Sequence, residues 1–265
     1  RHEVIGKTDH DLFPKEEADR FTRTDREVLE SGTGSDIPEE PLQIRGKGLR
    51  VMHTKRIPVC GADGRSQYLL SIWEDITERK RAELRLNAQH AVTRILSESD
   101  TLETAVPRIL QAIGESLGWD VGVFWRLDKH ARVLRCLEAW HAPSVRASEF
   151  LSLTKQIVFE SGVGLPGRVW AGGQPAWIRD VPKDANFPRA SVAAQVGLHG
   201  AAAFPVKLGA EVYGVIEFFS HDVQPPDPEL LQILVSIGSQ LGQFTERKVA
   251  EEALRQSKDH LRQVQ

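Results

Sequence analysis

Apolar side chains recur with several different periods along this chain, and each period predicts a kind of element. Within residues 14–31, Phe21 and Val28 stand one heptad apart, as in an amphipathic helix. Pro14 and Gly32 suit the first turn and the end of that helix. Three strand-like segments follow, at residues 41–46, 49–59 and 66–74. The first part of the chain therefore predicts one helix and an antiparallel meander, with a hairpin turn at Asp63-Gly64.

A continuous stretch of helix-favouring residues, without Gly or Pro, begins after Ile76. Its apolar residues recur at steps of 4, 3 and 4, at Leu84, Ala88, Ala91 and Ile95. This spacing predicts a helix with a heptad-like seam about two heptads long. The alternative is an ordinary amphipathic helix that packs on its own domain.

A second domain is predicted from about Asp100. It opens with a helix that ends at Gly118, and residues 120–127 and 132–140 then read as a hairpin. Residues 143–200 are rich in Gly and Pro and predict short helices and a long loop. The clearest strands of the chain are residues 200–208 and 211–220, with Gly209 in the turn between them.

The C-terminal segment predicts a long helix that begins at Pro228, with Asp227 as its N-cap. Apolar or small residues keep steps of 4 and 3 in two runs: Leu230, Leu234, Ile237, Leu241 and Phe244, then Ala250, Leu254, Ser257, Leu261 and Val264. The step between the runs is six residues, which predicts a change of seam there. The tetrapeptide Thr-Glu-Arg-Lys begins at Thr77 and again at Thr245, and we expect each copy to lie where a helix leaves a domain.

The composition is that of a globular protein with room for about two domains: 265 residues, 40% apolar, 27% charged and a net charge of −3. This charge gives no electrostatic reason to expect nucleic acid as a partner. No apolar run reaches the ~18 residues of a membrane span. Because the chain begins at Arg1, we expect it to be a piece of a longer protein. Cys60 and Cys136 read most simply as reduced cysteines of a cytoplasmic protein.

Few residues offer catalytic or metal chemistry. The segment GVGLPG at residues 162–167 fits a dinucleotide fingerprint in letters, but Pro166 removes a backbone N–H that phosphate would need. None of the nine His residues stands at metal-ligand spacing from Cys or another His, and none carries a phospho-acceptor motif. We therefore expect no catalytic residues, no metal and no required cofactor within these residues.

A ligand pocket in the second domain is the remaining possibility. Trp140 and Trp177 could form its walls or belong to the core, as aromatic residues often do. Arg168, Asn186 and Arg189 could supply polar contacts to a small ligand. The alternative for these three is hydrogen bonding between loop and helix.

Residues 1–83 resemble the C-terminal part of a PAS domain. The resemblance rests on VIGKTDHDLFPKEEADRF, the three-stranded meander and the exit WEDITERKRAE. It implies that the first strands and short helices of this domain precede Arg1. Haem in this part is left open by the resemblance, although no His is placed to bind it.

Residues 97–246 resemble a GAF domain of bacterial multi-sensor histidine kinases. The segments that carry this are GVGLPGRVWAGGQPAWIRDV, NFPRA, GLHGAAAFPV and EVYGVIEFFS. The cyclic-nucleotide signature of some GAF domains is not found, and Cys136 is poorly placed for a covalent bilin. The resemblance implies an α+β chain, in which a partial PAS fold precedes a GAF fold with an antiparallel sheet flanked by helices. Its expected parts are residues 1–78 (PAS), 79–98 (linker signalling helix), 99–246 (GAF) and 247–265 (C-terminal signalling helix).

The last residues, ALRQSKDHLRQVQ, resemble the segment that leads into the dimerisation and phosphotransfer helices of histidine kinases. The resemblances imply a cytoplasmic sensory and relay region of a two-component histidine kinase. They imply a homodimer through the signalling helices, a downstream kinase domain, a response regulator and an unidentified small ligand. The expected seam comprises Leu84, Ala88, Ala91, Ile95, Ala250, Leu254 and Leu261. The alternatives are an input region of a cyclic-di-GMP cyclase or phosphodiesterase, and a dimerisation scaffold without ligand.

Overall fold

The computed structural model of the chain describes residues 5–44, 48–223 and 225–264, with side chains as far as residue 257. The chain divides into two compact units, Arg1–Glu83 and Leu84–Gln265. Each unit combines helices with an antiparallel sheet, which confirms the predicted α+β class. Each is described by itself below.

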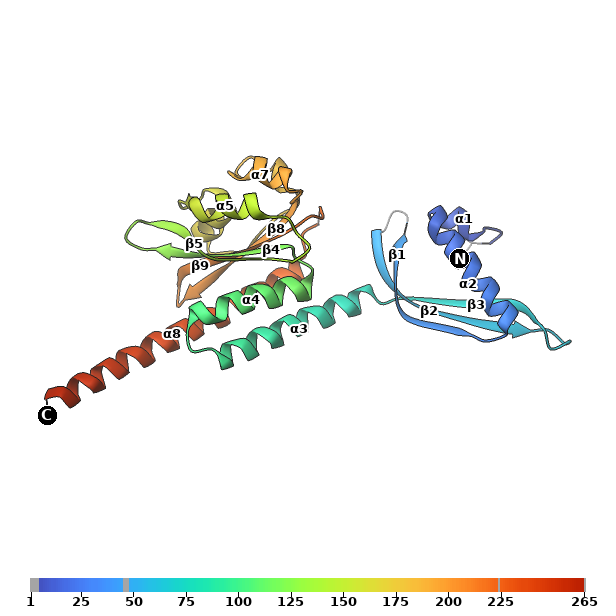
Figure 1. The fold of residues 1–265 in the computed structure, drawn as a ribbon, viewed down its shortest axis with the longest axis horizontal. Coiled ribbons are helices and arrows are strands. Elements are labelled where there is room, and N and C mark those ends of the chain that lie inside the picture. The colour runs from blue at the N-terminus through green and yellow to red at the C-terminus, as the bar shows by residue number, and fades with distance from the viewer. Residues whose placement is uncertain (1–4, 45–47, 224, 265) are drawn as a thin grey trace. The chain divides into compact units, whose positions relative to one another are not determined.

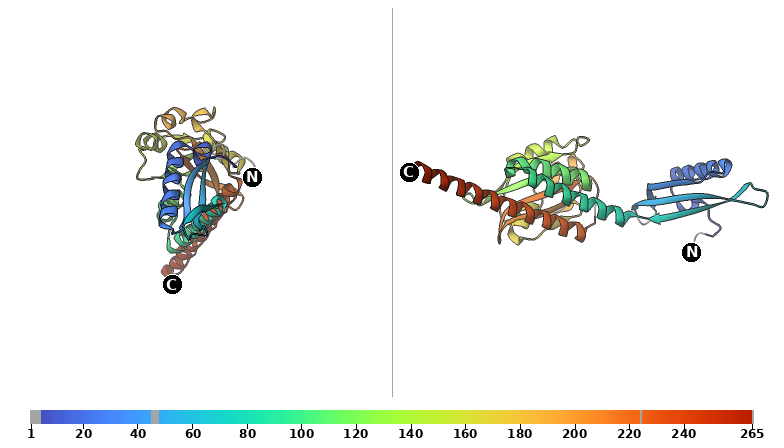
Figure 2. Two further views of the ribbon diagram at one scale, coloured as in Figure 1. Left: turned by 90° about the vertical axis from the view of Figure 1, so that its right-hand side faces the viewer. Right: turned by 90° about the horizontal axis from the view of Figure 1, so that it is seen from below.

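Among its described residues, the first unit contains α1, α2, the start of α3 (Thr77–Glu98) and a three-stranded sheet in the order β1-β2-β3. Its elements are α1 (Asp9–Leu12), α2 (Lys15–Ser31), β1 (Ser35–Ile44), β2 (Gly48–Cys60) and β3 (Ser66–Asp75). Figure 2 shows α2 lying along one face of this sheet. Strand β1 begins six residues before the predicted start, because its polar first half pairs with β2 through the backbone, with a register shift between Ile37 and Glu40.

The core of the first unit is small. Phe21 of α2, Leu42 of β1 and Met52 of β2 are buried together, and Phe13 and Trp73 pack against them. The β2–β3 turn contains Gly64 with a φ of 76°, the positive φ predicted from the Asp-Gly pair. The first Thr-Glu-Arg-Lys follows β3 directly and begins α3 (Thr77–Glu98).

The second unit is built on a six-stranded antiparallel sheet in the order β6-β5-β4-β9-β8-β7. Its strands are β4 (Val121–Asp128), β5 (Val133–His141), β6 (Val158–Phe159), β7 (Ala176–Ile178), β8 (Gly200–Leu208) and β9 (Glu211–Ser220). The two hairpins predicted from the sequence, β4–β5 and β8–β9, are both present. The segment around Val158, which lacks a strand-like pattern, forms only a two-residue edge strand.

Helices cover both faces of this sheet (Figure 1). One face packs against α3, α4 (Leu102–Leu117) and α8 (Pro228–Val264) through a core that includes Val92, Ile109 and Ile237. The other carries α5 (Ser148–Gln156), α6 (Gly164–Gly172), the 3₁₀ helix η1 (Val181–Lys183) and α7 (Ala190–Gln195). These short elements enclose a second core, which includes Phe150, Phe159 and Phe219. The sheet therefore separates a long-helix layer from a short-helix layer.

The long helix α8 runs through the second Thr-Glu-Arg-Lys without a break. Its predicted apolar run is buried: Leu230, Leu234, Ile237, Leu241 and Phe244. Thr245 is 6% exposed, and from Glu246 to Ser257 every side chain is exposed except the half-buried Lys248. The second copy therefore marks the point where α8 leaves its domain, whereas the first copy marks the start of a helix.

Two glycines set how closely α8 lies against the sheet. A Cβ at Gly238 would overlap the carbonyl oxygen of Pro205, and one at Gly242 would overlap that of Lys207. Pro205 and Lys207 both belong to β8. Because neither glycine has a side chain, the helix touches the backbone of the strand directly.

The burial of α3 corrects part of the predicted seam. Ala88 is fully buried and Ile95 is 4% exposed, within the core of the second unit. These positions are therefore closed to a second chain, because α3 packs on its own domain. Leu84 and Leu254 are 44% and 57% exposed and remain accessible. The side chain of Leu261 lies outside the described residues.

Candidate functional site

The interior between the sheet and the short-helix layer holds a buried ion pair. Nη2 of Arg189 donates to both carboxylate oxygens of Glu217, at 2.7 and 2.9 Å. Both side chains have no solvent exposure. Nε1 of Trp125 donates to Glu217 at 2.8 Å, and Nη1 of Arg189 donates to the Thr154 hydroxyl at 3.1 Å. Two charges so deeply buried need this pairing, because an unpaired charge would be strongly destabilising there.

Aromatic rings surround the guanidinium of Arg189. Its Cζ atom lies within 4.9–5.4 Å of five ring centroids, those of Trp125, Phe150, Phe159, Phe187 and Phe219. A cation within about 6 Å of a ring centroid is attracted by the ring's quadrupole. The guanidinium is therefore held by a carboxylate and by a cage of aromatic rings. We call Arg189, Glu217 and these five rings the arginine cage.

Strand alternation places the acid in the cage. Along β9, Val215 and Phe219 belong to the short-helix core, and Ile216 and Phe218 belong to the long-helix core. Glu217 falls on the short-helix side because successive strand residues face opposite ways. Arg189 reaches the same space from the other direction, since it immediately precedes α7 in the short-helix layer.

Burial and hydrogen bonding shift the pKa of the Glu217 carboxyl in opposite directions. Burial raises the pKa of Glu217, while the charge of Arg189 and the hydrogen bonds from Arg189 and Trp125 act to lower it. Nε of Arg189 is buried and has no hydrogen-bond partner. The guanidinium is therefore held through its two terminal nitrogens, Nη1 by Thr154 and Nη2 by Glu217, and its remaining surface faces rings.

Arg168 and Asn186 lie beside the cage and hold the chain that leads into it. Nδ2 of Asn186 donates to the carbonyl of Gly162 at 2.9 Å, and its Oδ1 accepts from the backbone N–H of Gly164 at 2.9 Å. Arg168 donates to Oδ2 of Asp184 at 3.1 and 3.2 Å. These are contacts between loop and helix, one of the two readings that the sequence left open. They pin residues 184–189 onto the glycine turn before α6.

Trp140 and Trp177 lie on the opposite face of the sheet. Both pack against the long-helix core. A Cβ on Gly114 of α4 would overlap the Trp140 ring, and Trp177 makes an edge contact with Trp119 at 5.6 Å between centroids. Of the five residues predicted to line a pocket, only Arg189 lies inside the cage. Glu217 was not predicted, and the only signal for it was an acid within an otherwise apolar strand.

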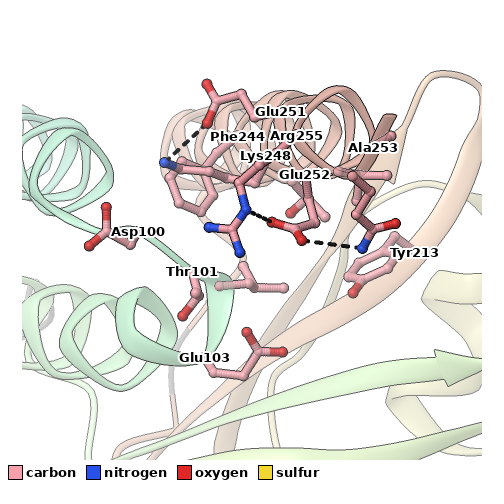
Figure 3. A pocket seen from close by; sticks show the side chains of 14 residues that line it. Asp100, Thr101, Glu103, Tyr213, Phe244, Lys248, Glu251, Glu252, Ala253 and Arg255 are labelled. Atoms are coloured by element: carbon pink, nitrogen blue, oxygen red, sulfur yellow. Dashed lines mark hydrogen bonds and ion pairs between the residues drawn. The ribbon is translucent and has the colours of Figure 1, made fainter. Parts of the chain in front are cut away.

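A groove lies at the surface of the second unit, where α8 leaves its domain. This groove has a volume of about 780 Å³ and lies between the residues that start α4 and one side of α8 (Figure 3). Its lining includes Phe244, Thr245, Val249, Tyr213 and Leu102. The charged groups of α8 around it are paired along the helix, Lys248 with Glu251 at 3.4 Å and Arg255 with Glu252 at 3.8 Å. The groove thus offers an apolar floor and charges that are already partnered.

The two long helices meet at a buried arginine. Nη2 of Arg85 in α3 donates to Oδ2 of Asp227 at 2.5 Å, and Nη1 donates to Oε2 of Glu229 at 2.5 Å. Asp227 also accepts from the backbone N–H of Leu230, at 2.9 Å, and so caps α8. Arg85 is only 7% exposed. The side chain of Arg85 in α3 therefore holds the first turn of α8.

Within residues 5–44, 48–223 and 225–264, no group of three or more His, Cys, Asp and Glu side chains could hold a metal ion. No helix among the described residues is both long and apolar enough to cross a bilayer. Cys60 and Cys136 are free thiols. Burial raises the pKa of the Cys136 thiol to about 11, and the charge of Glu217 adds to this shift.

Comparison with known protein families assigns both parts of the chain. The sequence profile described as GAF domain matches residues 99–246, and that described as PAS fold matches residues 1–81. The uncharacterized protein y4lL of Sinorhizobium fredii is 32% identical over 133 residues. This match covers 49% of the chain and 15% of the relative's length.

Solved structures share the fold of the second unit. The GAF domain of A. aeolicus nlh2, solved in an inactive state, has a TM-score of 0.51 and 24% identity, and the match covers 63% of this chain and 98% of that one. The free methionine-R-sulfoxide reductase of Neisseria meningitidis, in complex with its substrate, has a TM-score of 0.54 and 15% identity, over 64% and 93%. The GAF domain of a phosphotransferase from Coxiella burnetii has a TM-score of 0.54 and 16% identity, over 65% and 98%.

Proposed function

The chain belongs to the GAF domain family and carries a PAS domain ahead of its GAF domain, and from this premise we propose that it is the sensory and relay region of a dimeric protein-histidine kinase. In this proposal a ligand or partner acts on PAS or GAF, and the change passes through α3 and α8 to a kinase domain beyond Gln265. That kinase autophosphorylates with ATP and passes the phosphate to a response regulator. The region works in the cytoplasm.

The observation that carries the proposal is the contact of Arg85 with Asp227 and Glu229. It couples the helix that follows PAS to the start of the helix that leaves GAF. A second contact lies further along the pair, where the Thr93 hydroxyl meets Oε1 of Gln240 at 3.4 Å. A shift of α3 would therefore act on α8 directly, which is the physical element that a relay needs.

The sheet offers a second input to the same helix. At Gly238 and Gly242, α8 contacts the backbone of β8. Strand β8 pairs with β9, the strand that carries Glu217. A change in the arginine cage that moved β9 would reach α8 across one strand. Signals from PAS and from the GAF interior would thus converge on one outgoing helix.

The dimer contact is proposed for the part of α8 beyond Thr245. Val249 and Leu254 are 64% and 57% exposed there. The groove beside them has an apolar floor, and its neighbouring charges are paired within the helix. Two copies of this segment would bury these apolar side chains against each other. The seam residues for this contact are Ala250, Leu254 and Leu261.

Disulfide crosslinking tests the dimer seam. The chain carries Cys60→Ser and Cys136→Ser, and single cysteines replace Leu254 or, as the control, Glu252, which lies about half a turn away around the helix. Oxidation is expected to link two copies rapidly at position 254 and slowly at position 252. Equal rates at both positions, or no covalent dimer at either, would contradict the proposed pairing.

The output is tested in the parent protein. Incubation with labelled ATP is expected to give phosphate that is stable in base and lost in acid, as phosphohistidine is. Formation of cyclic-di-GMP from GTP would instead favour the cyclase alternative.

One observation favours a second candidate function, a dimerisation scaffold that binds no ligand. The GAF interior is filled by the chain's own Arg189, which is fully buried. A scaffold has no need of an accessible pocket. Mass spectrometry of the purified protein separates the two, because a co-purifying small molecule would favour the sensor over the scaffold.

A further inference from the structure

We infer that the arginine cage of the GAF domain is a binding site for a guanidinium or ammonium group, and that Arg189 is its resident occupant. The inference rests on the proposed sensory function, because it names the ligand class of the site on which that function would act. An external ligand of this class would enter only when Arg189 leaves.

The walls of the cage are complementary to an organic cation. Glu217 supplies a buried carboxylate, and Trp125 orients it through its indole N–H at 2.8 Å. Five rings surround the cation at 4.9–5.4 Å. Carboxylate and aromatic faces together select a weakly hydrated cation over a neutral molecule or a metal ion. The cage therefore has the chemistry of a receptor for guanidinium or substituted ammonium.

Arg189 belongs to a chain segment that lies at the surface of the domain. Pro188 and Asn186 are exposed, whereas Phe187 and Arg189 are buried. Figure 1 shows α7, which follows Arg189, on the side of its layer away from the sheet. The Arg189 side chain thus passes from a surface segment into the interior, as a tethered ligand would.

The guanidinium of Arg189 does not use all of its hydrogen-bond donors. Nε of Arg189 is buried without a partner, and only Nη2 contacts Glu217. The segment itself is pinned by Asn186, whose amide bonds to Gly162 and Gly164 of the neighbouring turn. Release of these two hydrogen bonds would let the segment move outward and the side chain withdraw. A soluble cation could then occupy the vacated cage.

Replacing the tethered ligand by a free one tests the inference. In Arg189→Ala, the missing atoms correspond to ethylguanidinium, and ethylurea is a neutral probe of similar shape. We expect millimolar ethylguanidinium to raise the Tm of the GAF transition in this variant by at least about 4 °C, because a ligand that binds only the native state stabilises it. Ethylurea should give no rise, and wild-type protein, whose cage is occupied, should shift by less than about 1 °C.

The control variant removes the acid as well. In Arg189→Ala/Glu217→Gln, the cage keeps its rings and its volume but loses its charge, and the ethylguanidinium shift should disappear. If Arg189→Ala does not fold alone, refolding with each probe replaces the thermal measurement, and recovery of native protein with ethylguanidinium but not with ethylurea is expected. Equal effects of both probes, no effect of either, or a shift that persists in the double variant would overturn the inference. These readouts need neither dimerisation nor relay, so their failure is distinct from failure of the crosslinking test.

Discussion

The guanidinium of Arg189 and the carboxylate of Glu217 lie 2.7–2.9 Å apart in the interior of the GAF domain, and neither side chain is exposed to solvent. The arginine comes from a surface segment and the acid from a central strand, 28 positions further along the chain. This pair joins the short-helix layer to the sheet.

Loss of one charge should cost far more than loss of both. Arg189→Met leaves a buried carboxylate with Trp125 alone, and we expect it to lower the free energy of unfolding by roughly 3–5 kcal/mol. Arg189→Met/Glu217→Gln should recover much of this loss, because no uncompensated charge remains. Arg168→Met, which removes an ion pair at a 34% exposed arginine, should cost less than about 1 kcal/mol. Urea denaturation measures all three, and simply additive losses in the double variant would contradict this account.

The same pair gives a pH dependence with a definite sign. Burial raises the pKa of Glu217 above the ordinary value of 4.5, so the folded form holds this proton more tightly than the unfolded chain. In Arg189→Met the guanidinium is gone, and only the hydrogen bond from Trp125 still opposes the effect of burial on this pKa. The stability of this variant relative to Arg189→Met/Glu217→Gln should therefore increase as pH falls toward the ordinary pKa of 4.5. A relative stability that stays constant, or that increases as pH rises, would show that the carboxyl is not buried as described.

Close packing of α8 on β8 can be tested at a glycine. Gly242→Ala places a methyl group on the carbonyl oxygen of Lys207, and we expect a loss of roughly 1–3 kcal/mol from the resulting overpacking. Gly172→Ala is the matched control, since a Cβ there meets nothing within 4 Å and the residue lies in helix α6. It should be neutral or stabilise by up to about 1 kcal/mol, because alanine favours helix. Thermal unfolding of both variants would show whether the helix touches the strand.

The two cysteines should differ in reactivity. Cys136 is half-buried, and its pKa of about 11 keeps it a neutral thiol near neutral pH. Cys60 is exposed at the end of β2. Iodoacetamide should therefore modify Cys60 in native protein and reach Cys136 only after unfolding, as peptide mass spectrometry would show. Early modification of Cys136 would mean that the strand around it opens.

Much of the fold was predictable because local signals and tertiary packing agree. The hairpin of β8 and β9 follows from two apolar runs around Gly209, and α4 ends at Gly118 in the left-handed conformation that its sequence predicts. The start of β1 was missed because it depends on pairing with β2 and not on its own polar residues. Helices and strands with an apolar pattern of their own could be predicted from the sequence. Segments that become strands only by pairing with a neighbouring strand could not.

The site was harder to predict than the fold, because it depends on which face each strand residue occupies. The pairing of β4 with β5 shifts register between Phe124 and Trp125, so that along β5 Cys136 packs on the short-helix core but Trp140, an even number of positions further on, packs on the long-helix core. A one-residue slip of this kind reverses every later assignment along the pair. This shift places Trp140 with the long-helix core, away from the arginine cage, which its spacing along the strand does not indicate. Glu217 was missed because its partner lies in an irregular segment, where no period indicates direction.

The central claim is that α8 carries the state of α3 to a dimer seam. Pulsed dipolar EPR with spin labels on Leu254→Cys, in the Cys60→Ser/Cys136→Ser background, measures the distance between the two copies. The account predicts a narrow intermolecular distance distribution that shifts or broadens in Arg85→Met, where the contact with Asp227 and Glu229 is lost, and that is unchanged in Arg108→Met, whose ion pair with Glu98 is about half exposed. The absence of an intermolecular signal, or identical distributions in all three proteins, would contradict it.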